Sequence, residues 1–492
     1  MNLLAHDNAV TVAPLIDGVV SNSESEVLVP VINPSNGRRC ALIPAGCAAD
    51  VDRAVASASR AFGGGHWSMA PSSCKKKALH CFADLITSQA ALLDAMDAQE
   101  MGKPIRERRF DAAAAANLMR FYAEAIDKVT GDVYRSDGNS FVSQRRVPRG
   151  VVAAVVPWNF PTFNAVLKIA PALAAGNSVI LKPSELSSQS AMHLAHLSTE
   201  AGLPPGVLNA VPGLGETVGR ALALHPHVDM VAFTGSSETG RRMLQYSGQS
   251  NMKVILAECG GKSPHVVFSD GADLDAASQY IAKMMLTNQG QICSVGSRLI
   301  VHRSVEAMMI ERISAWFKQI VMGDALDPNT TFGPVASDKQ CERVMQYIHA
   351  AESEGAELVI GGRRVLIETG GYFIEPTLFR NVLPTARIAQ EEIFGPVLSV
   401  ISFETEADAI SIANGTMYGL AAYVWTADLS RGMRLARDIR SSVRVNAAAP
   451  AGEAAGHAPS FEAAGQSGVG IEGGVAGMES YLRRQLVWFN YA

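Results

Sequence analysis

The chain has 492 residues, of which 48% are hydrophobic and 18% are charged, and its formal net charge is −5. This length exceeds one ordinary hydrophobic core and predicts two or three structural units, while the composition excludes an intrinsically disordered chain. The mild charge gives no reason to expect a nucleic-acid partner, and no run approaches the ~20 apolar residues that span a membrane.

The cysteines and the N-terminus indicate a cytoplasmic protein. Seven cysteines, an odd number, are scattered along the chain, which favours reduced thiols. The N-terminus has no basic region followed by a long apolar run, so we expect no secretory signal. No Cys/His cluster has the spacing of a zinc site, so we expect no metal. Two basic clusters, at 74–81 and 105–110, are interpreted as solvated helix faces.

From residue 151 onward, short apolar runs alternate with helical stretches. The expected strands are 151–156, 178–183, 207–213, 230–235 and 254–259. Helices are expected at 162–175 and 188–201 and from about 216 and 236. This alternation predicts an α/β fold with a doubly wound parallel sheet, in which ligands lie beyond the carboxyl ends of the strands.

A second α/β alternation follows residue 261. Its expected strands are 265–268, 297–302, 358–362, 397–403 and 421–426, with helices around 274–287, 304–320 and 336–354. Two strand-like segments lack a local sheet: a hairpin at 131–150, with Asp137-Gly138 at its turn, and the tail 481–491. Unpaired strands often pair across a subunit interface, so we interpret both segments as an oligomerisation element.

Polar residues stand at the ends of several expected strands in the first half. Asn159 lies in "PWNFP", Lys182 and Glu185 lie in "KPSE", and Ser236 lies in "FTGSSETG" at the start of a helix. A carboxylate and an amine at a strand end suit an adenine ribose, and a helix N-terminus suits a pyrophosphate. Taken singly, each also fits a turn asparagine, a surface ion pair or a helix cap. Together they favour a dinucleotide site.

Two further residues carry reactive groups. Glu258 ends the apolar strand of "LAECGGKSP", and a buried carboxyl with a raised proton affinity suits a general base. Cys293 lies among glutamines, glycines and serines in "LTNQGQICSVGSR". These surroundings leave the thiol open to a substrate, whereas burial among apolar residues would raise its pKa and make it inert.

These residues sit in motifs that resemble the aldehyde dehydrogenase superfamily. "PWNFP", "KPSE", "FTGS", "ECGGKSP", "NQGQICSVGSR" and "EEIFGPV" occur in the family's order and spacing, and the similarity covers essentially the whole chain. The presence of Glu258 places the chain with the hydrolytic members and not with those that acylate coenzyme A. The overall similarity is greatest to γ-glutamylaminobutyraldehyde and general aldehyde dehydrogenases.

The resemblance implies the aldehyde dehydrogenase fold. An NAD-binding domain is expected at 1–130 and 151–260, a catalytic domain at 261–476, and a β oligomerisation element at 131–150 and 477–492. The implied assembly is a homodimer or homotetramer, and the implied cofactor is NAD. Glu185 also favours NAD over NADP, because a carboxylate beside the ribose 2′-hydroxyl repels the 2′-phosphate of NADP.

The resemblance also implies a role for each matching residue. Cys293 is the expected nucleophile, Asn159 an oxyanion donor and Glu258 the base that activates water. The expected cofactor-binding residues are Trp158, Lys182, Glu185, Gly215, Ser236, Glu392 and Phe394. The expected substrate-binding residues are Phe163, Leu167, Thr287, Ile292, Ser294 and Phe461.

The chain departs from the family in the loop 458–474, where Glu462-Ala463 and Gly465 replace the usual glycines and lysine. Thr287 stands where relatives often have an aromatic residue, and 445–459 is nearly free of large side chains. These features predict a wide funnel for long, bulky or amino aldehydes. Cys259 is either a small core residue or a site of reversible oxidation. A cofactor-independent thiol esterase and a non-catalytic protein are the alternative functions.

Overall fold

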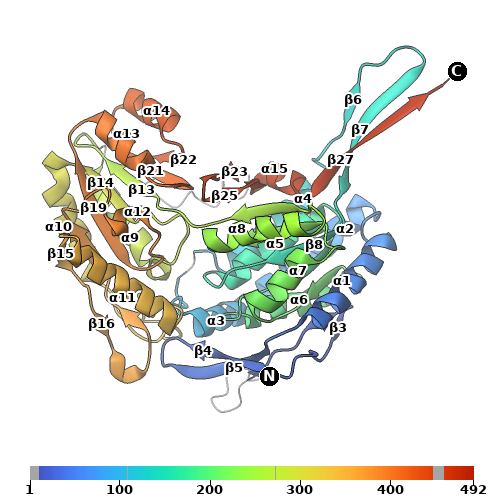
Figure 1. Ribbon diagram of the computed structural model, residues 1–492, viewed down its shortest axis with the longest axis horizontal. Helices are drawn as coiled ribbons and strands as arrows, with labels where there is room; N and C mark the ends of the chain where they lie inside the picture. The colour runs from blue at the N-terminus through green and yellow to red at the C-terminus, as the bar shows by residue number, and fades with distance from the viewer. Residues whose placement is uncertain (1–9, 108, 272, 447–458, 492) are drawn as a thin grey trace.

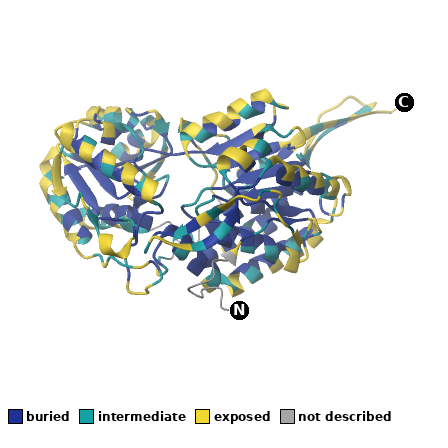
Figure 2. Ribbon diagram, turned by 60° about the horizontal axis from the view of Figure 1, so that its bottom comes forward, coloured by how far each residue is buried: buried dark blue, intermediate teal, exposed yellow. Residues whose placement is uncertain are grey.

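The computed structural model describes residues 10–107, 109–271, 273–446 and 459–491. The chain forms two lobes, each built on a large sheet, and a long arm projects from one lobe (Figure 1). Strands of both sheets are buried, and exposed residues lie on the outer faces of the surrounding helices (Figure 2). Within the described residues, no helix combines the length and apolar character needed to cross a bilayer.

The first lobe contains an eight-stranded sheet whose centre is parallel, as predicted. In spatial order the central strands are β12 (Val254–Glu258), β11 (Met230–Thr234), β8 (Val151–Val155), β9 (Ser178–Lys182) and β10 (Leu208–Ala210). Antiparallel strands flank this centre: β25 (Gly468–Val469) beside β12, and β2 (Leu15–Ile16) with β3 (Val19–Val20) beyond β10. All five strands expected from the sequence are therefore present.

Alternation along these strands explains why the first sheet is covered on both faces. In β8, Val152 and Ala154 join one hydrophobic core, while Ala153 and Val155 join the core on the opposite face. The helices of the first core are α2 (Ser72–Ser88), α4 (Ala112–Ala125), α5 (Pro161–Ala174) and α6 (Gln189–Glu200). Those of the second core are α1 (Ala48–Gly63), α7 (Arg220–Leu224) and α8 (Ser237–Gln249).

The second lobe contains a seven-stranded sheet. Its parallel strands, in spatial order, are β18 (Thr377–Arg380), β19 (Val397–Phe403), β14 (Arg298–His302), β13 (Pro264–Val267), β21 (Ala421–Trp425) and β22 (Ser442–Val445). The strand expected at 358–362 is β15 (Glu357–Ile360), and it runs antiparallel at the edge beside β18. The sequence analysis missed β18 and β22, which have four residues each.

Six helices cover the second sheet. They are α9 (Leu274–Leu286), α10 (Glu306–Phe317), α11 (Asp338–Ser353), α12 (Arg387–Gln390), α13 (Glu406–Asn414) and α14 (Leu429–Asp438). The cores again alternate along each strand: Leu299 packs with α9 and α10, whereas Ile300 packs with α13 and α14. The second lobe is therefore a separate doubly wound unit with its own core.

The arm is a three-stranded antiparallel sheet of β6 (Asp132–Tyr134), β7 (Ser140–Pro148) and β27 (Leu482–Asn490). The expected hairpin and tail thus pair with one another, along nine residues from Leu482 opposite Pro148 to Asn490 opposite Ser140. α15 (Gly474–Glu479) connects the tail to the first lobe. The role of the arm in oligomerisation stays a prediction.

One sequence interpretation is wrong. The basic cluster at 105–110 is not a helix face, because its described residues, 105–107 and 109–110, lie in turns and loop between α3 (Ala90–Met101) and α4. The helix stops at Gly102, whose φ is +84°, and Pro104 follows shortly after.

The remaining short elements are β1 (Val10–Thr11), β4 (Leu28–Asn33), β5 (Arg38–Pro44), β16 (Arg364–Val365), β17 (Phe373–Ile374), β20 (Tyr418–Gly419), β23 (Phe461–Glu462), β24 (Ala464–Gly465), β26 (Ile471–Glu472) and the single-turn helices η1 (Gly215–Gly219), η2 (Thr287–Gly290), η3 (Arg303–Val305) and η4 (Ile367–Thr369).

Candidate active site

The candidate residues meet where the carboxyl ends of the first sheet face the loop between α9 and β14. Asn159 follows β8, Glu258 ends β12, and Cys293 lies in that loop. The side-chain amide of Asn159 donates a hydrogen bond to the carbonyl of Gln291 at 3.0 Å. This contact ties the first lobe to the second, two residues before Cys293.

The loop that carries Cys293 has an unusual backbone. Asn288, Gln289 and Gly290 have φ values of +46°, +54° and +69°. Asn288 and Gln289, the two non-glycine residues in this left-handed run, store strain that only a well-packed environment sustains. At Gly290, an added Cβ would lie 2.5 Å from the carbonyl oxygen of Gly395, so the loop packs tightly against the segment after Phe394. The position of Cys293 is therefore fixed by the packing of its loop against the segment at Gly395 and by the hydrogen bond from Asn159 to Gln291.

Asn159 is held in a single orientation. Its Oδ1 accepts a hydrogen bond from Asn164 at 3.3 Å, and its main-chain carbonyl accepts one from Asn288 at 2.8 Å. The side chain is buried, with 5% of its surface exposed. Because the amide nitrogen carries two hydrogens and Gln291 takes one, the other is free to donate to an oxyanion at Cys293.

The Cys293 thiol is half-buried and protonated in the free protein. Burial raises the pKa of Cys293 to about 12, and the negative charges of Glu392 and Glu258 add to this shift. The sequence argument, based on the polar neighbours of Cys293, pointed the other way. It failed first because the fold buries the sulfur despite its polar neighbours, and second because two carboxylates distant in sequence, from β12 and from the segment after α12, lie near it. The thiol needs a positive charge or a base nearby before it can act as a nucleophile.

Glu258 lies in a buried polar cluster that the sequence analysis missed. It is 5% exposed, and burial, together with the charge of Glu472, raises its pKa well above the ordinary value. Glu472 forms a buried ion pair with Lys168 of α5. One oxygen of Glu258 has no hydrogen-bond partner within the described part of the chain. The lysine was detectable: it is a lone charge within the apolar helix "AVLKIAPALA". Its partner was not.

Glu392 lies over the two glycines that follow β12. Its Oε1 accepts a hydrogen bond from the backbone N–H of Gly261 at 3.1 Å, and a Cβ at Gly260 would lie 2.0 Å from its Oε2. Burial raises the pKa of Glu392 to about 7. Phe394, with φ +60°, places its ring edge-to-face with Trp158 at 5.3 Å between centroids. Three of the expected cofactor residues therefore converge beside Glu258.

The other expected cofactor residues lie along the same sheet edge. Lys182 Nζ is 3.5 Å from the Glu185 carboxylate, and the lysine is almost fully buried. Ser236 caps α8, its hydroxyl accepting from the Thr239 N–H at 3.2 Å. Gly215 begins η1 after β10, the strand next to β9, and a Cβ there would meet no atom within 4 Å. An amine–carboxylate pair, a helix N-terminus and open space over a glycine fit a dinucleotide.

The expected substrate residues fall into two groups. Phe163 is half-buried and contacts Phe110, with 4.8 Å between ring centroids, and Phe110 also contacts Phe160 at 5.0 Å. The aromatic ring of Phe110 was not anticipated, and it narrows the expected funnel on this side. Leu167 is half-buried against the core of the first lobe. Ile292, by contrast, is 2% exposed and belongs to the core of the second lobe.

The remaining substrate residues surround the Cys293 loop. Thr287 donates to the carbonyl of Lys283 at 2.8 Å, and the carbonyl of Ser294 accepts from the Tyr423 hydroxyl at 3.0 Å. Phe461 is opposite Glu472 in the β23–β26 pair. Most of the segment 445–459, on which the wide funnel was predicted, lies outside the described residues, so that part stays a prediction.

Comparison with known proteins identifies the family. The pattern of the aldehyde dehydrogenase family matches residues 20–487. The chain belongs to this family. It is 42% identical to the aminoacetaldehyde dehydrogenase of Pseudomonas aeruginosa over 84% of this chain and 82% of that protein. It is also 42% identical to the NADP/NAD-dependent aldehyde dehydrogenase PuuC of Escherichia coli, over 88% and 87% of the two chains.

Solved structures agree with this aldehyde dehydrogenase fold. The indole-3-acetaldehyde dehydrogenase of P. syringae, in complex with NAD+ and IAA, superposes with a TM-score of 0.95 at 41% identity, covering 98% of this chain and 97% of that one. The γ-glutamyl-γ-aminobutyraldehyde dehydrogenase of Burkholderia cenocepacia gives 0.95 at 42% identity, with 99% and 98% covered. The predicted family, fold and enzyme class of this aldehyde dehydrogenase are confirmed.

Proposed function

We propose that this enzyme oxidises an aldehyde to the carboxylic acid with NAD, through a covalent intermediate on Cys293. The observation that carries the proposal is the convergence of three groups: a half-buried thiol, an oriented amide and a buried carboxyl. Solved relatives in complex with NAD+ support the choice of cofactor.

Each residue of this site has one task in the proposed reaction. The Cys293 thiolate attacks the aldehyde carbon and forms a C–S bond, and the Asn159 amide and the Cys293 backbone N–H stabilise the oxyanion. When bound, the nicotinamide ring accepts the hydride that leaves this carbon, which becomes a thioester. Glu258 then removes a proton from water as it attacks the thioester, and the C–S bond breaks to release the acid and the thiol.

The proposed cofactor contacts follow the sheet edge. Lys182 and Glu185 bind the adenosine ribose, and Gly215 and the α8 N-terminus at Ser236 adjoin the pyrophosphate. Glu392 binds the nicotinamide ribose, with Phe394 and Trp158 beside the ring. Glu185 favours NAD over NADP, although the E. coli relative is named for both cofactors. Comparable kcat/KM values for the two cofactors would contradict this preference.

The proposed substrates are long, bulky or amino aldehydes. The names of the relatives include aminoacetaldehyde, indole-3-acetaldehyde and γ-glutamyl-γ-aminobutyraldehyde. A specificity constant for acetaldehyde well above those for hexanal and an arylaldehyde would contradict this choice.

A homodimer or homotetramer, assembled through the arm, is also proposed. The support is the exposure of large apolar residues on β27: Leu486, Trp488 and Phe489 are 57%, 62% and 56% exposed. Contiguous exposed apolar side chains mark interaction surfaces.

Replacing Cys293 with alanine tests the function. We expect the variant to lose aldehyde-dependent NADH formation, because the bond to the substrate carbon cannot form, while it still binds NAD in a fluorescence titration. Cys74→Ala is the matched control, because Cys74 is an exposed free thiol. Turnover that survives in Cys293→Ala would exclude this nucleophile. Hydrolysis of p-nitrophenyl acetate without any aldehyde-dependent NADH formation would instead favour the thiol esterase alternative.

A further inference from the structure

Two arginines, half-buried Arg109 and exposed Arg444, lie near the Cys293 loop. Arg444 of β22 lies with its guanidinium carbon 5.5 Å from the centre of the Tyr423 ring, and its Nη1 is 3.4 Å from the Tyr423 hydroxyl. Arg109 approaches from the turn between α3 and α4, where its guanidinium contacts the sulfur of Met284 and lies 5.2 Å from the Phe110 ring centre. Within the basic cluster at 105–110, Arg109 therefore packs beside Met284 and Phe110 and does not lie on a helix face.

Arg444 contacts Tyr423 directly, whereas Arg109 approaches the same region through Met284. Tyr280 and Met284 lie one turn apart on α9, Tyr280 is 5.8 Å from Tyr423, and Met284 contacts Arg109. Burial raises the pKa of Tyr423, and the positive charges of Arg444 and Arg109 both oppose this shift. The two guanidinium groups thus act on one location, although they come from opposite ends of the chain.

Neither guanidinium has a carboxylate partner among the described residues. The acid nearest in sequence, Glu107, uses its carboxylate to accept from the backbone N–H of Arg109. Other arginines of the second lobe do pair with carboxylates, as in the contacts of Arg431 and Arg434 with Glu406. Two positive charges that lack a carboxylate partner in the described residues and lie beside aromatic side chains are typical of a site that binds an anion.

The arginines adjoin the proposed substrate pocket at two points. Arg109 is next to Phe110, whose ring contacts Phe163. Arg444 contacts Tyr423, which donates its hydrogen bond to the carbonyl of Ser294, the residue after Cys293. A chain that starts at Cys293 and runs along the phenylalanines therefore ends near guanidinium groups.

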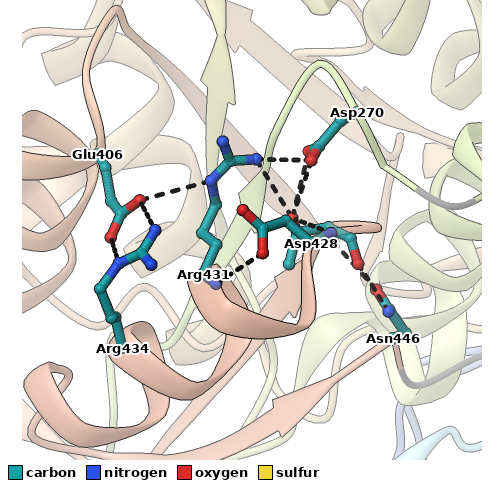
Figure 3. Close-up of polar contacts among 7 residues, drawn as sticks. Asp270, Glu406, Asp428, Arg431, Arg434 and Asn446 are labelled. Carbon is teal, nitrogen blue, oxygen red and sulfur yellow. Dashed lines mark hydrogen bonds and ion pairs between the residues drawn. The ribbon is translucent and has the colours of Figure 1, made fainter.

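The position of Arg444 is supported by the end of its strand. Asn446 exchanges two hydrogen bonds with Thr426, at 3.0 and 2.8 Å, and so fixes the end of β22 against β21. This pair belongs to a network with Asp270, Asp428 and Arg431 (Figure 3). The network supplies hydrogen-bond partners for Arg431 of α14, and Arg444 of β22 is not part of it.

We propose that Arg109 and Arg444 bind a carboxylate at the far end of the aldehyde substrate, so that the preferred substrate is an ω-carboxy aldehyde. The proposal rests on the proposed function, and among the substrate classes proposed there it favours long aldehydes with an anionic end over aldehydes with an ammonium group. Guanidinium binds carboxylate through paired, charge-assisted hydrogen bonds, and it repels the ammonium group of an amino aldehyde. A substrate with an apolar middle section and an anionic end matches this spatial order, in which the phenylalanines come before the arginines along the path from Cys293.

Three aldehydes of equal chain length test the proposal: hexanal, 6-oxohexanoate and 6-(trimethylammonio)hexanal. The measured quantity is the ratio of kcat/KM for each charged aldehyde to that for hexanal, followed by NADH absorbance. We expect the ratio for the anion to exceed one by about tenfold and the ratio for the cation to lie below one. We expect Arg109→Leu and Arg444→Leu each to lower the anion ratio by about tenfold, and the lysine variants to retain part of it.

Because each variant is judged by a ratio, a loss of folded enzyme does not imitate the expected result. Arg38→Leu is the matched control, because Arg38 is exposed on β5 in the first lobe, and its ratio is expected to equal that of the wild type. An anion ratio near or below one, or leucine variants that keep the wild-type ratio, overturns the carboxylate site while hexanal oxidation still supports the proposed function. Absence of NADH formation with all three aldehydes overturns the proposed function itself.

Discussion

In the free enzyme, the negative charge of Glu392 disfavours the thiolate form of Cys293. The carboxylate of Glu392 contributes to the raised pKa of the thiol, whereas burial alone raises the pKa of Glu392 to about 7. At neutral pH the carboxyl is therefore partly protonated, and the thiol is protonated throughout. A bound pyridinium ring with its positive charge would favour the ionised form of both groups. The resting site is thus chemically quiet, which protects an accessible cysteine from oxidation.

The first prediction concerns the reactivity of this thiol. We expect the rate of Cys293 alkylation by iodoacetamide to increase from pH 7 to pH 10 without a plateau, because its pKa is raised to about 12. Glu392→Gln removes a negative charge and lowers this pKa, so we expect roughly three- to tenfold faster alkylation at pH 8, where Glu392 is ionised. Mass spectrometry of the Cys293 peptide measures the rate, with exposed Cys74 as the internal control. A plateau below pH 8 would contradict the assignment.

The second prediction concerns Glu392 and the cofactor. Only the carboxylate form accepts hydrogen bonds from both hydroxyls of a ribose. Its pKa is raised from the ordinary value to about 7, so the ionised fraction increases through that pH. We expect KM for NAD to fall by about tenfold between pH 6 and pH 8, and to lose this dependence in Glu392→Gln. An equal pH profile for the two proteins would show that another group controls cofactor binding.

At the scale of the element, the loop from α9 to β14 depends on a buried aromatic layer beneath it. His265 of β13 is fully buried and stacks on Tyr423 with 4.7 Å between ring centroids. Both ring nitrogens lack a partner in the described structure, and burial lowers the pKa of His265 to about 3, so the ring is neutral. Gly296 lies directly on this ring. The histidine therefore serves as a flat support for the loop.

The third prediction is that Gly296→Ala displaces this loop. A Cβ at Gly296 would lie 2.2 Å from Cδ2 of His265, and Tyr423 limits the movement of the ring. We expect a loss of about 1–3 kcal/mol in the free energy of unfolding, measured with urea. We also expect kcat to fall by about tenfold or more because Cys293 moves.

Two variants control for the interpretation of Gly296→Ala. Gly248→Ala adds the same methyl group on α8, where no atom lies within 4 Å, and is expected to be neutral or slightly stabilising. Combining Gly296→Ala with His265→Ala creates room for the methyl group and is expected to restore part of kcat. If the double variant is as slow as the single one, the histidine does not position the loop.

Local patterns in the sequence predict elements better than they predict partners. The strands of the first sheet were predicted because short, continuous apolar runs are typical of strands that are buried on both faces. β18 and β22 were missed because four residues, several of them polar, give little periodicity. β25 has two residues and pairs with β12, although the expected catalytic domain included its range. The domain boundaries remain a prediction.

The same distinction holds for the site. Cys293, Glu258 and Asn159 lie in motifs that are informative on their own. The pair of Lys168 and Glu472 joins residues 304 positions apart, so no local pattern indicates it. The environment of Arg109 likewise depends on Met284, which is 175 positions away. Side-chain chemistry can be predicted from the sequence, whereas the electrostatic environment that sets each pKa requires the fold.

At the scale of the whole molecule, several sheet edges remain unpaired within the described residues. β27 is an edge strand of the arm, and β22 is an edge strand of the second sheet. The arm extends away from the first lobe (Figure 1). On β27, Leu486, Trp488 and Phe489 are exposed to solvent. An exposed, apolar edge strand of nine residues invites association unless another copy of the chain covers it. This edge supports the proposed oligomer.

The fourth prediction is that charges on this strand dissociate the oligomer. We expect the wild type to have the mass of a dimer or tetramer by light scattering, and the double variant Leu486→Glu, Trp488→Glu to have a lower mass. Each buried side chain of this size contributes about 1.5–3 kcal/mol, so the two changes weaken association by at least about a hundredfold. Leu429→Glu is the control, because Leu429 is 80% exposed at the start of α14 in the second lobe. A monomeric wild type, or an unchanged mass in the double variant, would rule out the arm as the interface. Because Leu486 and Trp488 pack against little in the single chain, a fall in mass with an intact circular dichroism spectrum identifies lost association and not unfolding.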